Sequence, residues 1–248
     1  MFPAGRCLLL WCALPLSVAV GQAQTLIGEF ALNSSLNNNV AGGAALVSLG
    51  GQVTALGYAF AKNQGLSFSS TALNVSNYTI ELSFQTNLDS AASWSKLVDI
   101  AAQGSDSGLY IHNNGGFKLQ FYPQSDASVA DFTTGTTFDV VLTRDGTTGL
   151  VTGYVNGQLR FSFSDTGSIG VVTATNNTLN FFVDDHNTGL NEASSGTVNY
   201  IRIYNGALSA SQVSALYTAG SPAAVPEPAT WALLALGAVG LVVVRRRA

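Results

Sequence analysis

Residues 138–165, FDVVLTRDGTTGLVTGYVNGQLRFSFSD, alternate apolar and polar side chains, and two turn sequences interrupt the alternation. A period of two is typical of a half-buried antiparallel strand, because successive side chains point to opposite faces. Asp145-Gly146 ends the first of these strands. Asn156-Gly157 is a strong short-range signal for a hairpin with a type I′ turn. The segment therefore predicts three consecutive antiparallel strands.

Strand patterns recur on both sides of this segment. Residues 77–87 read NYTIELSFQTN, residues 109–122 read LYIHNNGGFKLQFY, and residues 179–185 and 198–204 read LNFFVDD and VNYIRIY. In the first of them one face is apolar and the other polar, which predicts a half-buried strand. The second contains Asn-Asn-Gly-Gly and predicts another hairpin. The fold class is mostly β, and two antiparallel sheets packed as a β-sandwich or jelly roll are expected.

One helix is predicted near the end of this strand-rich region. Ser209 and Gln212 have the spacing of a capping box, Leu208 and Val213 occupy the positions of a hydrophobic staple, and Gly220 ends the pattern. The helix is expected at the edge of a sheet.

The two ends of the chain differ in composition from the middle. Arg6 precedes an apolar run and small residues follow it, so residues 1–23 are predicted to be a secretory signal peptide. Both cysteines, Cys7 and Cys12, lie in this segment, and the mature chain is expected to contain no disulfide.

The C-terminal segment 225–248 reads VPEPATWALLALGAVGLVVVRRRA. Its uncharged stretch 229–244 is somewhat short for a membrane span of about 20 residues, but a thinned bilayer can accommodate it. The following arginines are expected to stay on the cytoplasmic side. With the N-terminus exported, this predicts a single transmembrane helix with type I topology.

The tail resembles a PEP-CTERM sorting signal. The residues that carry the resemblance are Val225, Pro226, Glu227 and Pro228, then the apolar helix, then Arg245, Arg246 and Arg247. The resemblance implies a bacterial protein that is exported through the inner membrane, anchored there transiently, and cut by an exosortase-type protease. The mature protein is then expected at the cell surface or outside the cell.

The remaining region, 24–220, is long enough for one domain, and residues 221–224 read as a short linker. Between residues 24 and 224, six basic residues face thirteen acidic ones, which gives a net charge of −7. Such a surface argues against nucleic acid as a partner and suits cations or neutral glycans better.

The domain itself is similar to LamG-like, concanavalin A-like domains. The resemblance rests on the TRD turn and YVNG hairpin of residues 138–165 and on the closing strand and helix of 198–217. It implies a β-sandwich. It leaves the ligand open, because this fold occurs in lectins, in glycosidases and in adhesion modules.

An acidic loop is the candidate metal site. Residues 181–196 read FFVDDHNTGLNEASSG, and Asp184, Asp185, Asn187 and Glu192 offer the carboxylate and amide oxygens that Ca²⁺ prefers. The resemblance adds that related domains often hold calcium at a loop edge. The alternative is a solvated loop whose aspartates cap their own turn amides.

A group of aromatic residues is the candidate ligand site. Trp94 is the single tryptophan of the predicted mature domain, and Tyr110, His112 and Tyr122 flank the hairpin of residues 109–122. Exposed aromatic rings beside polar loops can stack on sugars, although large aromatic residues more often belong to a core.

Sequence patterns for catalysis are missing. No Glu-x-Asp-x-x-Glu run, no Gly-x-Ser-x-Gly elbow and no nucleotide-binding loop occurs in the sequence. The sequence thus predicts a non-enzymatic surface or matrix protein that binds extracellular polysaccharide or a cell-surface glycan. A structural matrix protein without a defined ligand and an unrecognised glycoside hydrolase remain as alternatives.

Overall fold

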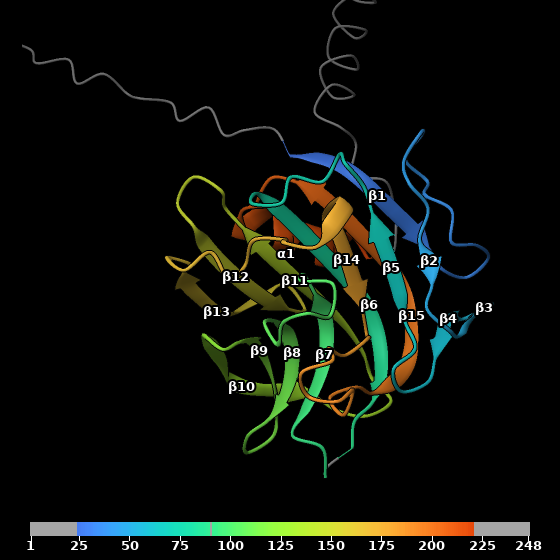
Figure 1. Cartoon of the computed structure of the whole chain (residues 1–248), viewed down its shortest axis with the longest axis vertical. Coiled ribbons are helices and arrows are strands. Elements are labelled where there is room, and N and C mark those ends of the chain that lie inside the picture. The colour runs from blue at the N-terminus through green and yellow to red at the C-terminus, as the bar shows by residue number, and fades with distance from the viewer. Residues whose placement is uncertain (1–23, 90, 221–248) are drawn as a thin grey trace, which may run out of the picture.

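The computed structural model of the chain describes residues 24–89 and 91–220, which form two antiparallel sheets layered face to face (Figure 1). The sandwich expected from the strand patterns is confirmed. The predicted signal peptide, linker, sorting signal and transmembrane helix lie outside the described residues. Within the described ranges, no helix is long and apolar enough to cross a bilayer.

The first sheet has eight strands. Seven of them follow the order β13-β12-β11-β6-β15-β4-β3. The eighth strand, β1, pairs with β15. The strand bounds are β1 Thr25–Ala31, β3 Gln52–Thr54, β4 Gly57–Phe60, β6 Tyr78–Asn87, β11 Thr137–Arg144, β12 Leu150–Val155, β13 Gln158–Ser164 and β15 Ser195–Asn205.

The second sheet has seven strands in the order β10-β9-β8-β7-β14-β5-β2. The strand bounds are β2 Val47–Ser48, β5 Leu66–Ser69, β7 Trp94–Asp99, β8 Gly108–Asn113, β9 Phe117–Tyr122, β10 Ser125–Phe132 and β14 Thr178–Phe181. The helical elements of the described residues are the 3₁₀ turn η1 Thr175–Asn177 and the helix α1 Ala210–Ala219.

The hairpin between β12 and β13 forms where the sequence predicts it. Asn156 and Gly157 have φ angles of 50° and 72°. A type I′ turn requires positive φ at both central residues, and asparagine and glycine tolerate this region best. The turn thereby fixes the register of β12 and β13 at the edge of the first sheet.

The helix α1 also begins as predicted, but its position differs. The Ser209 side chain accepts a hydrogen bond from the backbone N–H of Gln212, whose own side chain reaches back to Ser209. The expectation that α1 lies at the sheet edge is wrong, because α1 packs on the outer face of the first sheet. A small apolar cluster joins the helix to this face: Val141, Tyr154, Tyr204, Leu208, Val213 and Leu216.

The prediction of a half-buried β6 is also wrong. Ile80, Leu82 and Phe84 face the other sheet and belong to the main core, as expected. Glu81, which faces the other way, is nevertheless fully buried. Side chains of the neighbouring strands cover it, so β6 is buried on both faces.

Candidate functional site

The outer face of the second sheet carries the aromatic residues singled out in the sequence. On β8, Leu109 and Ile111 point into the core, so Tyr110 and His112 point outward. Strand register places His112 opposite Trp94 of β7. The strands β7, β8 and β9, green in Figure 1, therefore present these rings on one surface.

The four predicted ligand-binding residues lie together. The Trp94 ring stacks on His112 with centroids 3.7 Å apart and planes 5° apart. Tyr110 and Tyr122 lie nearly perpendicular to Trp94, with centroids at 5.6 and 5.4 Å. The two edge-to-face contacts have a geometry that is favourable for aromatic rings. The group is thus a packed aromatic cluster rather than a set of separate surface rings.

The acidic loop between β14 and β15 lies against this cluster. The Asp185 carboxylate accepts backbone N–H groups of Asn187 and Thr188 at 2.8 and 3.2 Å. The Lys96 backbone N–H donates to the Glu192 carbonyl at 2.8 Å and joins the loop to β7. The turn-capping role that the sequence left open for these aspartates is therefore present, and it sets where the loop lies.

The carboxylates that come together are not the set expected from the sequence. Oxygen atoms of Asp106, Asp185 and Glu192 lie within 4.8 Å of one another. The Asp184 carboxylate is buried, and one of its oxygens accepts the Glu192 backbone N–H at 2.8 Å. Asn187 is exposed. The structure thus places Asp184 and Asn187 outside this carboxylate group and adds Asp106, which sequence reasoning missed.

A second residue that the sequence did not reveal is Lys96. Its ammonium Nζ lies 2.5 Å from Oδ2 of Asp185, and both side chains have no exposed surface. The Tyr110 hydroxyl donates to Asp106 at 2.8 Å and lies 3.3 Å from the same Asp185 oxygen. Lys96 follows Trp94 by two positions and so shares its face of the strand, which is the signal that could have pointed to it.

The crowding of carboxylates changes their acidity. Burial, helped by repulsion from Asp106, Asp184 and Asp185, raises the pKa of Glu192 to about 7. Burial also raises the pKa of Asp106. Burial acts in the same sense on Asp185, but the hydrogen bond and charge of Lys96 outweigh it, and the net effect lowers the pKa of Asp185. Near neutral pH, Glu192 therefore exchanges between a hydrogen-bond donor and an acceptor.

These residues border a recess of about 120 Å³ lined by Trp94, Asp106, Tyr122 and Glu192. Two aromatic rings offer apolar contact, and two carboxylates offer hydrogen-bond acceptors. Concave sites that combine apolar walls with a few polar groups are typical of small-ligand binding. The two candidate sites that the sequence kept apart are thus one site in the fold.

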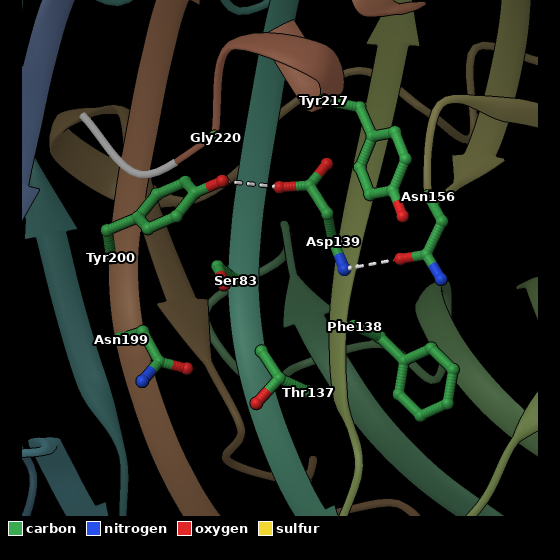
Figure 2. Close-up of a pocket in the computed structure, with 9 residues that line it drawn as sticks. All are labelled: Ser83, Thr137, Phe138, Asp139, Asn156, Asn199, Tyr200, Tyr217 and Gly220. Carbon is green, nitrogen blue, oxygen red and sulfur yellow. Dashed lines mark hydrogen bonds between the residues drawn. The ribbon is translucent and has the colours of Figure 1, made fainter. Parts of the chain in front are cut away.

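A larger recess of about 360 Å³ lies on the opposite sheet, and Figure 2 shows its lining residues. The Asp139 carboxylate of β11 accepts a hydrogen bond from the Tyr200 hydroxyl of β15 at 2.6 Å. The Asn156 side chain accepts the Asp139 backbone N–H at 3.0 Å. Gly220 forms part of the wall. The candidate site is placed at the recess beside Trp94, because that recess brings together residues of both groups that the sequence singled out.

Beneath the larger recess lies a buried ion-pair network. Arg202 of β15 pairs with Glu81 at 3.1 Å and with Glu29 at 3.2 Å. The Tyr200 hydroxyl also lies 3.3 Å from Glu81, so it bridges Glu81 and Asp139. Burial, together with the charge of Asp139, raises the pKa of Glu81 to about 7 even against the opposing effect of Arg202. Glu81 does not line the recess and cannot contact a ligand there.

Comparison with known proteins agrees with the architecture. The family model described as the concanavalin A-like lectin/glucanases superfamily matches residues 60–214. A model of the PEP-CTERM protein-sorting motif matches residues 224–247. No curated protein matches the sequence.

Solved structures with the same fold have low sequence identity to the chain. Domain 4 of AbnA, an extracellular GH43 arabinanase from Geobacillus stearothermophilus solved with arabinotriose, is 17% identical, with a TM-score of 0.57 over 78% of this chain and 98% of that one. The binding domain of botulinum neurotoxin serotype D is 16% identical, with a TM-score of 0.57 over 79% of this chain and 52% of that one. Trypanosoma rangeli sialidase, solved with sialic acid, is 17% identical, with a TM-score of 0.58 over 77% of this chain and 32% of that one.

Proposed function

Because the chain belongs to the concanavalin A-like lectin/glucanase superfamily and ends in a PEP-CTERM sorting motif, we propose that it is an exported, exosortase-processed protein whose domain binds a glycan without catalysis. The motif implies export and sorting. In the proposed course, the tail anchors the chain in the inner membrane until processing, and the mature protein then acts at the cell surface or in the extracellular matrix. The ligand is an extracellular polysaccharide or a cell-surface glycan.

The observation that carries this proposal is the recess beside Trp94. An aromatic ring can cover the C–H face of a sugar, while Asp106 and Glu192 accept hydrogen bonds from its hydroxyl groups. The excess of carboxylates over the single ammonium of Lys96 disfavours sugars that carry carboxylate or sulfate groups. A neutral or positively charged sugar unit is the expected ligand class.

The geometry of the carboxylates supports a non-catalytic role. A glycosidase uses two carboxyl groups that flank the scissile bond, one of them as a proton donor. Beside Trp94, Asp185 is paired with Lys96 and Asp106 accepts the Tyr110 hydroxyl. In the other recess, Asp139 is accessible only at its edge and Glu81 is buried below it.

Replacing Trp94 with alanine is expected to weaken glycan binding by about 10–100-fold, because a central aromatic contact is typically worth about 2 kcal/mol. A glycan array probed with the full chain in detergent, with calcium and again with chelator, identifies the sugar. Calorimetric titration of that sugar then compares Trp94→Ala with the parent chain.

The matched control is Tyr217→Ala, which removes an exposed aromatic ring of helix α1, on the side of the first sheet. It is expected to leave the affinity unchanged. Equal affinity of the Trp94→Ala variant and the parent would remove the recess from the proposal. An array without any bound glycan would favour the structural matrix role.

A further inference from the structure

The cluster of carboxylates beside Trp94, formed by Asp106, Asp185 and Glu192, already contains a positively charged group of the protein, the ammonium of Lys96. Lys96 Nζ lies 2.5 Å from Asp185 Oδ2, 4.9 Å from the centre of the Tyr110 ring and 3.5 Å from the Ser105 carbonyl oxygen. A buried lysine is costly unless it is paired and hydrogen-bonded. These contacts supply the pairing, so the ammonium is a fixed part of the site.

A divalent cation does not fit beside this ammonium. Calcium binds carboxylate oxygens at about 2.3–2.6 Å and takes six to eight oxygen ligands. Lys96 occupies that distance from Asp185 Oδ2, and the other Asp185 oxygen accepts two backbone N–H groups. Asp106 in turn accepts the Tyr110 hydroxyl. Both oxygens of Asp185 are thus already engaged, and a metal would meet the charge of Lys96 at close range.

Strand β8 flanks the lysine side chain. Strand register holds Lys96 opposite Tyr110, and a Cβ on Gly108 would be in ordinary contact with Lys96 Cε at 3.6 Å. The same Cβ would lie only 2.4 Å from the Val98 carbonyl oxygen, so the close approach of the backbone requires glycine at this position.

We propose that Lys96 is a permanent internal cation that takes the place of a divalent metal in this site. It holds Asp185 in position, with Asp106 linked through Tyr110, so that the recess keeps its shape without calcium. Only the part of this proposal that concerns glycan binding rests on the proposed function. Its metal-binding consequences are independent of any sugar.

Terbium luminescence tests the proposal directly, because Tb³⁺ replaces calcium at oxygen sites and a bound ion next to Trp94 is excited through the indole. The parent chain is expected to show no Trp94-dependent terbium emission, and its melting temperature should be the same in calcium and in chelator. Lys96→Met keeps the unbranched shape and most of the length of the side chain and removes the charge. This variant is expected to bind Tb³⁺ about tenfold or more tightly than the parent, since the repulsion is gone. Calcium should then raise its melting temperature.

Three controls assign the signal. Trp94→Phe in the Lys96→Met background should abolish the emission that is excited selectively through the indole, Asp185→Asn should abolish the binding, and Lys96→Arg should behave as the parent does. The proposal is overturned if the parent binds Tb³⁺ as tightly as Lys96→Met does. It is equally overturned if chelator lowers the melting temperature of the parent and Asp185→Asn removes that effect. The parent measurements decide the matter even where Lys96→Met folds poorly.

The glycan readout separates this inference from the proposed function. Glycan affinity that is equal in calcium and chelator supports both. Affinity that is lost in chelator supports glycan binding and contradicts the internal cation. An absence of glycan binding with unchanged metal results contradicts the proposed function alone.

Discussion

Replacing Arg202 with methionine is expected to lower the free energy of unfolding by about 3–5 kcal/mol, because a buried ion pair that loses one partner leaves an uncompensated buried charge. Arg202 is 1% exposed and lies between Glu81 of β6 and Glu29 of β1. Its guanidinium also lies 4.8 Å from the centre of the Tyr200 ring. Methionine fills part of the same volume but supplies neither charge nor donor. Thermal unfolding should show a melting temperature lower by roughly 6–20 °C.

A matched control is available at the edges of the two sheets. Arg160 of β13 pairs with Asp131 of β10 through two hydrogen bonds of 2.6 and 2.7 Å, but the arginine side chain is 18% exposed. Arg160→Met is therefore expected to cost only about 1 kcal/mol. The double variant Arg202→Met/Glu81→Gln should recover part of the loss, since it removes one of the stranded charges. Equal losses at Arg202 and Arg160 would show that burial does not control the strength of these pairs.

The stabilising role of this network explains why the first sheet tolerates so many polar residues on its outer face. Strand register places Arg202 opposite Glu81, and Tyr200 opposite Ser83 next to Asp139. Arg202 and Glu81 thus lie in one row across neighbouring strands, and Tyr200 and Asp139 lie in another row, on either side of Ser83. The helix α1 covers the adjacent apolar rows. Arg202, Glu81, Glu29, Tyr200 and Asp139 are paired with one another, which suits a structural role.

Local sequence signals predicted the parts of the fold that depend on neighbours in the chain. The Asn156-Gly157 turn needs positive φ angles at two adjacent residues, and the Ser209 cap needs a partner three residues on. Both features can be predicted from the sequence because the residues that produce each of them lie within a few positions of one another. The side of the sheet on which α1 packs depends instead on Val141 and Tyr204, which are distant in sequence, and the prediction of an edge position failed for that reason.

The candidate site shows the same division. Sequence patterns drew attention to Trp94 and to the acidic loop, but not to their contact. Asp106 lies in a loop before β8 with no metal-binding spacing to Glu192, and only the pairing of β7 with β8 and β14 brings the two together. The pairing of Lys96 with Asp185 spans 89 positions of sequence. The period of two predicts which face of the strand a residue occupies, but it does not predict which loop covers that face.

Three carboxyl-to-amide changes test whether buried carboxyl groups make the stability of the domain depend on pH. Glu81→Gln mimics the protonated form of a buried carboxyl group. Asp89→Asn makes the same chemical change at an exposed carboxylate. Glu192→Gln reports the smaller contribution of the recess, because that side chain is only partly buried. A parent chain that is most stable at pH 8, or a Glu81→Gln variant with the parent's pH profile, would contradict the assignment.

The domain is expected to be most stable near pH 4.5–5 and to lose about 2–3 kcal/mol as the pH rises to 8. Glu81 has a pKa of about 7 in the folded protein against 4.5 as its ordinary value. Between these values the folded state holds a proton that the unfolded state has released, so stability falls as the pH rises through this window and is level above it. The pKa of Glu192, also raised to about 7, adds in the same direction. Urea denaturation at pH 5, 6, 7 and 8 should show this decline in the parent, a clearly shallower decline in Glu81→Gln that reflects Glu192, and the parental slope in Asp89→Asn.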